Sequence, residues 1–185
     1  MRRIVLTFGL IAGAILVAMM FVTVAIVDNV GFEGTEALGY TSMVLAFLMV
    51  YFGIRSYRDN VVGGAIGFGR AFGVGILIML VASACYVAAW EVIYYKVVPD
   101  FGEKYAAHML DQARAEGATE AELAAKTAEL RRFAELYRNP FFNAGVTFLE
   151  PLPVGLIMTL VSAGILRRPR KTRAEGAVGG VSVAV

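Results

Sequence analysis

Residues 141–166 read FFNAGVTFLEPLPVGLIMTLVSAGIL, and this stretch decides the class of fold. As an α-helix its 26 residues would be about 39 Å long at ~1.5 Å per residue, more than the ~30 Å hydrocarbon core of a bilayer. The run holds one acid, Glu150, beside Pro151 and Pro153. We therefore expect a membrane-spanning helix with an ionisable group and a proline kink inside it.

The composition of the whole chain agrees with this interpretation. Of the 185 residues, 58% are hydrophobic and 17% are charged, and the mean hydropathy is +0.68. Soluble domains carry about 25% charged residues and about 45–50% apolar ones. The apolar surplus is gathered in four blocks, so the sequence predicts an all-α membrane protein whose four transmembrane helices cover about 4–27, 37–54, 71–95 and 141–166.

Several classes of chemistry lack their motifs in this sequence. The chain has neither GxxxxGK[ST] nor GxSxG. Cys85 is the single cysteine and His108 the single histidine, so no cluster has metal-ligand spacing. A net charge of +2 is too small to indicate nucleic-acid binding. We expect no catalytic residue, no metal, no cofactor and no enzyme activity, and a membrane-embedded hydrolase would lack its nucleophile–base pair.

The first apolar block follows a short basic head, Arg2 and Arg3. A cleaved signal peptide is the rival interpretation of this pattern. Signal-peptide apolar regions run only about 7–15 residues, whereas 4–27 is free of charge throughout. Because three further blocks follow, we interpret this one as an uncleaved span.

Two GxxxG patterns occur in the apolar blocks. Gly9 and Gly13 form the first, and Gly69 and Gly73 form the second. The pattern lets a neighbouring helix approach closely, but it is also common by chance in apolar segments. Each pair is therefore only a candidate packing face.

The connections between the blocks differ in character. Residues 28–36 contain three acids and no base, which predicts a short polar turn. Residues 61–69 are glycine-rich, and their spacing fits no phosphate-binding loop, so we expect a flexible connector on the bilayer surface.

Residues 97–140 form the only sizeable polar region and predict a helical hairpin outside the bilayer. Helices are expected over 101–116 and 120–137, with Gly117 ending the first. Thr119 and Glu122 have the spacing of a capping box. Acids and bases nearly balance along both helices, as on a solvated surface.

The basic residues at the ends of the blocks predict the orientation. Positive charges mark the cytoplasmic side of a span, and they lie in the head, in the second connector and after 166. Both termini are then cytoplasmic and the hairpin is extracytoplasmic. The domain organisation we expect is one four-span domain over 1–173 and a disordered cytoplasmic tail over 174–185.

Several short blocks together resemble a known family. They are Ser42-Met43, Phe52-Gly53-Ile54-Arg55-Ser56-Tyr57-Arg58-Asp59, Gly63-Gly64, Phe68-Gly69-Arg70-Ala71-Phe72, Pro99-Asp100-Phe101, Glu103-Lys104-Tyr105, His108-Met109, Asn139-Pro140, Phe148-Leu149-Glu150 and Pro153-Val154-Gly155-Leu156. The sequence resembles the bacterial membrane proteins of domain-of-unknown-function family 4199 over nearly its whole length. This resemblance implies a four-span protein of the bacterial inner membrane. It implies no activity, substrate or site residue.

Glu91 and Glu150 are the candidate proton or cation site. A carboxylate within the hydrocarbon costs about 2.5–3.5 kcal/mol on insertion scales, so such groups are functional candidates. Spans three and four are antiparallel, which would bring both acids toward the extracytoplasmic side, where they could share a proton or a cation. The alternatives are that Glu150 merely fixes the kink, and that Glu91 pairs with Lys96 or a hairpin base.

The basic residues at the cytoplasmic side are candidate contacts for anionic lipid headgroups. An ordinary role in setting the topology is the alternative. The residues are Arg55, Arg58, Arg70, Arg167 and Arg168.

Two functions remain open at this stage. The first is a non-enzymatic structural or partner-binding membrane protein, whose hairpin meets another membrane or periplasmic protein. The second is a small proton- or cation-coupled transporter or channel that uses Glu91 and Glu150, and four spans would then require a homo-oligomer.

Overall fold

The structure is a computed structural model that describes residues 1–167, and every regular element in this range is helical. The elements are α1 (Arg2–Asn60), α2 (Phe68–Val92), the π-helical turn η1 (Ile93–Val97), α3 (Phe101–Ala115), α4 (Glu120–Tyr137), α5 (Pro140–Leu149) and α6 (Pro151–Leu166). The tail predicted over 174–185 lies outside the described residues.

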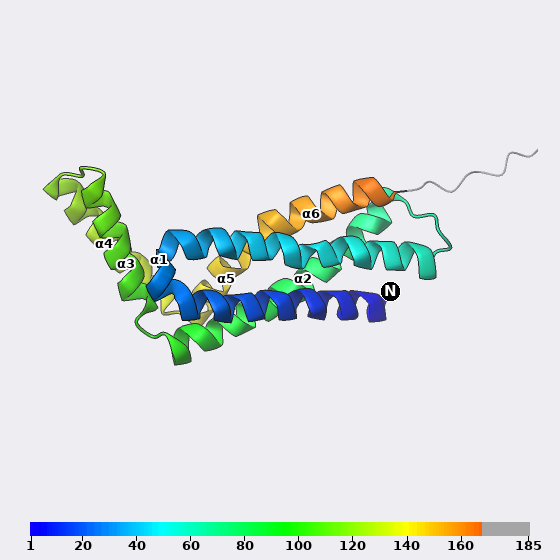
Figure 1. Ribbon diagram of the computed structural model, residues 1–185, viewed down its shortest axis with the longest axis horizontal. Coiled ribbons are helices and arrows are strands. Elements are labelled where there is room, and N and C mark those ends of the chain that lie inside the picture. Colours follow the sequence, from blue (N-terminus) through cyan, green and yellow to red (C-terminus); the bar gives the residue numbers. More distant parts are fainter. Residues whose placement is uncertain (168–185) are drawn as a thin grey trace, which may run out of the picture.

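Helix α1 consists of two antiparallel limbs that meet at one glycine (Figure 1). Gly31 has φ 78° and ψ 170°, a conformation that only glycine adopts readily. The polar turn predicted over 28–36 is therefore wrong in extent, because the helix resumes directly after Gly31. The hydroxyl of Thr35 donates to the carbonyls of Gly31 and Phe32, and so helps to hold the first turn of the second limb.

Within residues 1–167, four helices are long and apolar enough to cross a membrane, which confirms the number of apolar helices predicted. They cover Arg2–Val27, Gly31–Asn60, Phe68–Val97 and Pro140–Leu166. They extend beyond the predicted ranges because polar and charged residues at their ends continue the helical path. The loop at 61–67 contains Gly63 and Gly64, both with positive φ.

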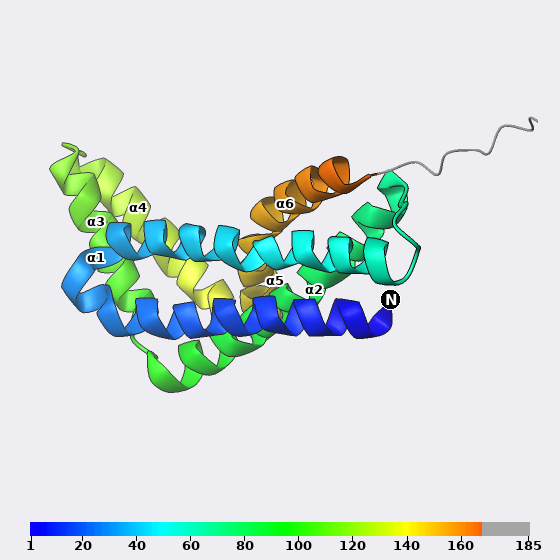
Figure 2. The ribbon, with the colours of Figure 1, turned by 45° about the vertical axis from the view of Figure 1, so that its right-hand side comes forward.

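The helices form a bundle in which α2 contacts both limbs of α1 as well as α5 and α6 (Figure 2). Gly9 and Gly13 lie against α2, where an added Cβ would come within 2.7 Å of Val81 and of Cys85. The first GxxxG is thus a packing face. Gly69 and Gly73 face open space, so the second pattern is not.

The two ends of the bundle differ. The N-terminus, the loop at 61–67 and the end of α6 lie at one end of the bundle (Figure 1). We call it the arginine end, because Arg55 and Arg58 are near the end of α1 and Arg167 directly follows α6. The turn at Gly31, η1 and the starts of α3 and α5 lie at the opposite end, which we call the aromatic end.

Helices α3 and α4 contact one another and project from the aromatic end (Figure 1). The ring of Phe32 packs against Phe101 and Tyr105 and stacks on His108, with centroids 4.9 to 5.9 Å apart. Thr119 and Glu122 form the expected capping box at the start of α4. The pair of helices is therefore fixed at its base to the turn of α1.

Candidate functional site

The helix that would form the fourth span is interrupted at Glu150. Pro151 and Pro153 have no N–H, so the carbonyls of Thr147 and Leu149 lose their usual amide donors. Glu150 itself keeps helical angles, φ −63° and ψ −55°, but α5 and α6 lie at an angle to one another (Figure 2). The predicted kink is present, and Glu150 lies between the end of α5 and the start of α6.

The carboxylate of Glu150 accepts a hydrogen bond from the hydroxyl of Tyr86 in α2, with an O–O distance of 2.6 Å. The two residues are 64 positions apart in the sequence. Hydrogen bonds to charged acceptors are short and strong, which fits this distance. Tyr86 is thus the partner that joins the helix break to α2, and the sequence analysis did not identify it.

A second set of hydrogen bonds lies between Glu150 and the aromatic end. The indole N–H of Trp90 donates to the hydroxyl of Tyr137 at 3.0 Å. The hydroxyls of Tyr137 and Thr147 are 3.2 Å apart, and Thr147 donates to Oδ1 of Asn143 at 3.2 Å. Since Tyr137 accepts from Trp90 and Thr147 donates to Asn143, the proton of Tyr137 goes to Thr147.

Asn143 closes this set into a ring, because its Nδ2 donates to the backbone carbonyl of Tyr137 at 3.4 Å. Asn143 and Thr147 are both fully enclosed, with 0% and 1% of their surface exposed. Burial raises the pKa of the Tyr137 hydroxyl. The ring therefore ties the end of α4 to α5, and Trp90 ties it to α2.

Glu91 has different surroundings from Glu150. Its Oε1 is buried and has no hydrogen-bond partner among the residues that the structure describes. Glu150 is hydrogen-bonded to Tyr86, so it lies at the height of Tyr86 along α2. Glu91 is five residues further along the same helix, a rise of roughly 7.5 Å from Tyr86. That the two acids share one proton or cation stays a prediction.

The packing of α2 against α6 sets the position of Ser83. An added Cβ on Gly75 would be 2.7 Å from Cγ2 of Thr159, and one on Gly155 would be 2.5 Å from Cγ of Met79. Gly75 is thus opposite Thr159, and Met79, four residues later in α2, is opposite Gly155, four residues earlier in α6. Continuing this antiparallel register by four more residues places Ser83 opposite Pro151. The hydroxyl of Ser83 is buried without a hydrogen-bond partner among the described residues.

The spacing of polar residues in the two apolar runs could have revealed this arrangement. Ser83, Tyr86 and Trp90 recur at intervals of three and four along α2. Asn143, Thr147 and Glu150 recur at intervals of four and three along the last run. Residues at such intervals share one helix face, so two polar faces in antiparallel spans are candidates to meet.

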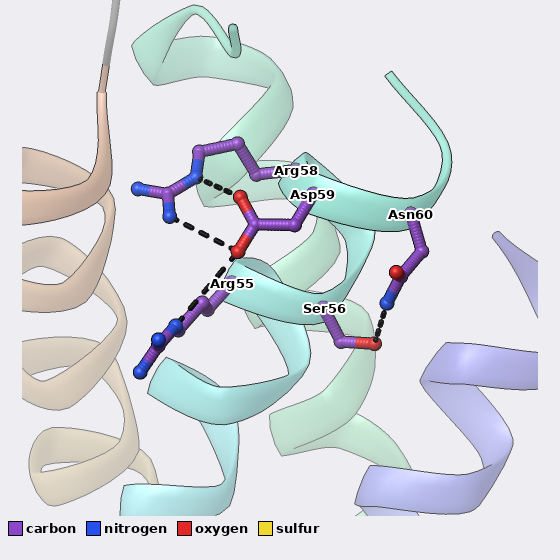
Figure 3. A network of polar contacts seen from close by, with 5 residues as sticks. All are labelled: Arg55, Ser56, Arg58, Asp59 and Asn60. Atoms are coloured by element: carbon purple, nitrogen blue, oxygen red, sulfur yellow. Dashed lines mark hydrogen bonds and ion pairs between the residues drawn. The ribbon is translucent and has the colours of Figure 1, made fainter. Parts of the chain in front are cut away.

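The arginine end has a separate polar cluster within one helical segment (Figure 3). Arg58 donates to both oxygens of Asp59, at 2.7 and 3.2 Å, and Nε of Arg55 is 3.8 Å from the same carboxylate. Asn60 donates to the hydroxyl of Ser56. A shallow groove of about 400 Å³ adjoins the cluster and is lined by Phe8, Met49, Phe52, Arg55, Ser56, Asp59 and Asn60.

The other candidate lipid contacts are Arg70, Arg167 and Arg168. Arg70 and Arg167 are exposed, and they lie at the arginine end because Arg70 is in the first turn of α2 and Arg167 directly follows α6. Arg168 lies outside the described residues. Within residues 1–167, no group of three or more His, Cys, Asp or Glu side chains could hold a metal ion.

Comparison with known families matches residues 7–168 to the model described as "Protein of unknown function (DUF4199)". The chain belongs to this family. No curated protein and no solved structure matches the DUF4199 chain. Membership in DUF4199 supplies neither an activity nor a ligand, so function has to be inferred from the geometry of the helix break and of the projecting helices.

Proposed function

We propose that this DUF4199 protein is a non-enzymatic, multi-pass protein of the bacterial inner membrane that binds another protein through α3 and α4. The observation that carries the proposal is how little these two helices bury. Ala113 is the one buried residue of α3, and α4 has none.

Two helices of this size need support from another surface. They contain 15 and 18 residues, and folded units below about 40 residues rarely bury enough surface to be stable alone. The aromatic contacts of Phe101 and Tyr105 support the base of α3. The far part has no such support, so a partner protein that covers it would stabilise it.

The charge pattern indicates how that partner would be recognised. Both helices are rich in alanine and carry acids and bases in nearly equal number, with pairs such as Lys104–Asp100 and Arg114–Asp111. Exposed pairs of this kind contribute little stability but favour one orientation of a partner. A protein with a mixed-charge surface fits better than a lipid or a nucleic acid.

The proposed orientation follows from the two ends of the bundle. Aromatic residues with polar tips favour the boundary between lipid and water, and Trp90, Tyr94 and Tyr95 lie at the aromatic end. Arginines favour the cytoplasmic boundary. With the arginine end inside, α3 and α4 project into the extracytoplasmic space.

The arginine end contacts anionic lipid headgroups in this arrangement. Arg55 is the best placed, because its side chain is 56% exposed and lines a groove together with the apolar side chains of Phe8, Met49 and Phe52. Each basic group near an anionic surface contributes on the order of 1 kcal/mol. Arg58 is held by Asp59, so its first role is to complete the end of α1.

The partner proposal is tested by shortening the projecting helices. Residues 110–132 are replaced by a short Gly-Ser turn, which keeps Phe101, Tyr105 and His108 of the aromatic base. The protein is then purified in mild detergent with its partners. We expect a protein that co-purifies with the wild type to be lost from the shortened variant and retained with Glu150→Gln. Retention after shortening would refute the proposal, provided that the variant remains monodisperse.

A second candidate function is a proton- or cation-coupled transporter or channel, active as a homo-oligomer. The short hydrogen bond between Tyr86 and Glu150, at a helix break inside an apolar span, favours it. Flux into liposomes that contain wild type or Glu150→Gln tests it. Pumping or leak that depends on pH or on a cation gradient, and that disappears in the variant, is the expected result.

A further inference from the structure

We propose that the break between α5 and α6 binds one monovalent cation, which is held by the carboxylate of Glu150, the hydroxyls of Tyr86 and Ser83, and the carbonyl of Thr147. This proposal deepens the transporter candidate, since it names the ligand class and the atoms that would hold it. It does not depend on the proposed role of α3 and α4.

The charge of Glu150 is the first step of the argument. Glu150 is exposed on the surface of the bundle, and Leu149 beside it is 62% exposed, as expected of a residue that faces lipid. A bare carboxylate there costs about 2.5–3.5 kcal/mol. The neutral hydroxyl of Tyr86 stabilises the carboxylate but does not cancel its charge, whereas a bound cation does.

Uncommitted oxygens around Glu150 are the second step. Pro151 cannot donate to the carbonyl of Thr147, which therefore keeps lone pairs free at the end of α5. The packing of α2 against α6 brings Ser83 opposite this break, and its hydroxyl is 0% exposed and without a hydrogen-bond partner among the described residues. A buried polar group of this kind implies a ligand that completes it.

The nature of these atoms selects the ligand. All of them are oxygens, which suit hard cations rather than soft ones. Only one is charged, so a single positive charge gives a neutral site. The carboxyl end of α5 carries a partial negative charge, and discontinuous membrane helices bind Na⁺ at such ends.

A proton would compete for the same carboxylate. The other titratable groups close to Tyr86 are Tyr40 of α1 and Tyr137 of α4, and neither is a carboxylate. Among the proposed ligands, Glu150 is the carboxylate, so a proton that binds it removes the negative charge that attracts the cation. Cation binding should therefore weaken as the pH is lowered.

The test measures thermal unfolding of the purified protein in detergent, in NaCl and in choline chloride of equal ionic strength. A ligand that binds only the folded state raises the unfolding temperature with its concentration. We expect NaCl to raise the midpoint of the wild type and Glu150→Gln to abolish the response. Ser83→Ala and Tyr86→Phe should each need about tenfold more Na⁺ for the same rise, the equivalent of one weakened ligand at ~1.4 kcal/mol.

Glu103→Gln is the control, because it removes an exposed acid of α3, outside the four apolar helices, and it should respond as the wild type does. Equilibrium binding of radioactive Na⁺ to the wild type keeps the test decisive if Glu150→Gln does not fold. No Na⁺ response in the wild type, or an undiminished one in Glu150→Gln, overturns the proposal. A midpoint that depends on pH through Glu150 but not on Na⁺ also overturns it and assigns the site to a proton.

Discussion

The two parts of α2 hold their neighbours by different means. Over residues 68–85, glycines of α1 and α6 lie close against α2. Gly75 of α2 in turn leaves the space that the side chain of Thr159 in α6 occupies. Over the last turns of α2 and the following η1, the contacts to other helices include hydrogen bonds from Tyr86 and Trp90 of α2 and from Tyr95 of η1. One helix thus packs by shape along its first part and by polar partners along its second.

This difference has a physical reason. Lipid is as apolar as the helix surfaces, so helices associate in a membrane through close van der Waals packing and hydrogen bonds. Glycines let two helices approach so closely that the interface has no room for an added side-chain atom. An interface held by hydrogen bonds can separate and exchange a bond for one to water or to an ion. The second part of α2 is therefore the better place for a functional site.

Gly75→Leu should have the largest effect on stability. An added Cβ would meet Thr159 at 2.7 Å and side chains of Val50 and Ile54 at 3.1 Å. We expect a loss of about 3 kcal/mol, the upper part of the range for overpacking, seen as a lower unfolding temperature in detergent. Gly73→Leu is the control on the same helix, because Gly73 faces open space. Equal losses in both variants would contradict the packing described for α2.

Asn143→Leu should cost about 2 kcal/mol. The substitution keeps the volume but deprives the Thr147 hydroxyl of its acceptor and the Tyr137 carbonyl of its donor. Adding Thr147→Val removes the hydroxyl that Asn143→Leu leaves without an acceptor. The double variant should therefore lose less unfolding free energy than the sum of the two single variants. Strict additivity would show that the ring of hydrogen bonds does not act as a unit.

Tyr137→Phe should cost about 1 kcal/mol, because Trp90 and Thr147 each lose a partner. The variant should also change the response to alkali. Burial raises the pKa of Tyr137 above its ordinary value of 10.0. The folded state therefore retains a proton that the unfolded state loses, so this contribution is full below that value and falls as the pH rises.

The measurement for Tyr137 is the unfolding temperature as a function of pH above neutrality. We expect a decline in the wild type at alkaline pH and a shallower decline in Tyr137→Phe. Identical slopes would mean that the hydroxyl is not buried in the membrane-embedded protein.

Tyr95→Phe should have the smallest effect, no more than about 0.5 kcal/mol. Its hydroxyl donates to the carbonyl of Arg138 at 3.1 Å, but the residue is exposed, so water can replace the bond. The same unfolding measurement checks this. A loss of unfolding free energy as large as that of Tyr137→Phe would show that Tyr95 belongs to the buried ring of hydrogen bonds.

Much of the fold could be predicted from the sequence because length and hydropathy constrain membrane helices strongly. The four apolar helices, the break at Glu150 and the cap at Thr119 follow from local composition and spacing. The extent of the turn at 28–36 was wrong, because its three acids suggested a longer loop. What joins the first two limbs is a single glycine conformation, and composition does not reveal it.

The site could be predicted only in part. Glu150 stands out because it is an acid in an apolar run, but a single sequence does not show which helix it faces. Tyr86 and Ser83 are ordinary residues for a membrane helix until the register of α2 against α6 is known. That register depends on Gly75 and Gly155, whose importance lies in the absence of a side chain.

The turn at Gly31 has a consequence for how the protein is made. Gly31 is the one non-helical residue inside α1, so only the short, acidic stretch 28–36 separates the two apolar runs as they leave the ribosome. The limbs would then enter the lipid together as a preformed pair, and the insertion machinery must hold both before releasing either. A residue with a side chain at position 31 would strain this turn, and so would oppose both the pairing of the limbs during insertion and the finished fold.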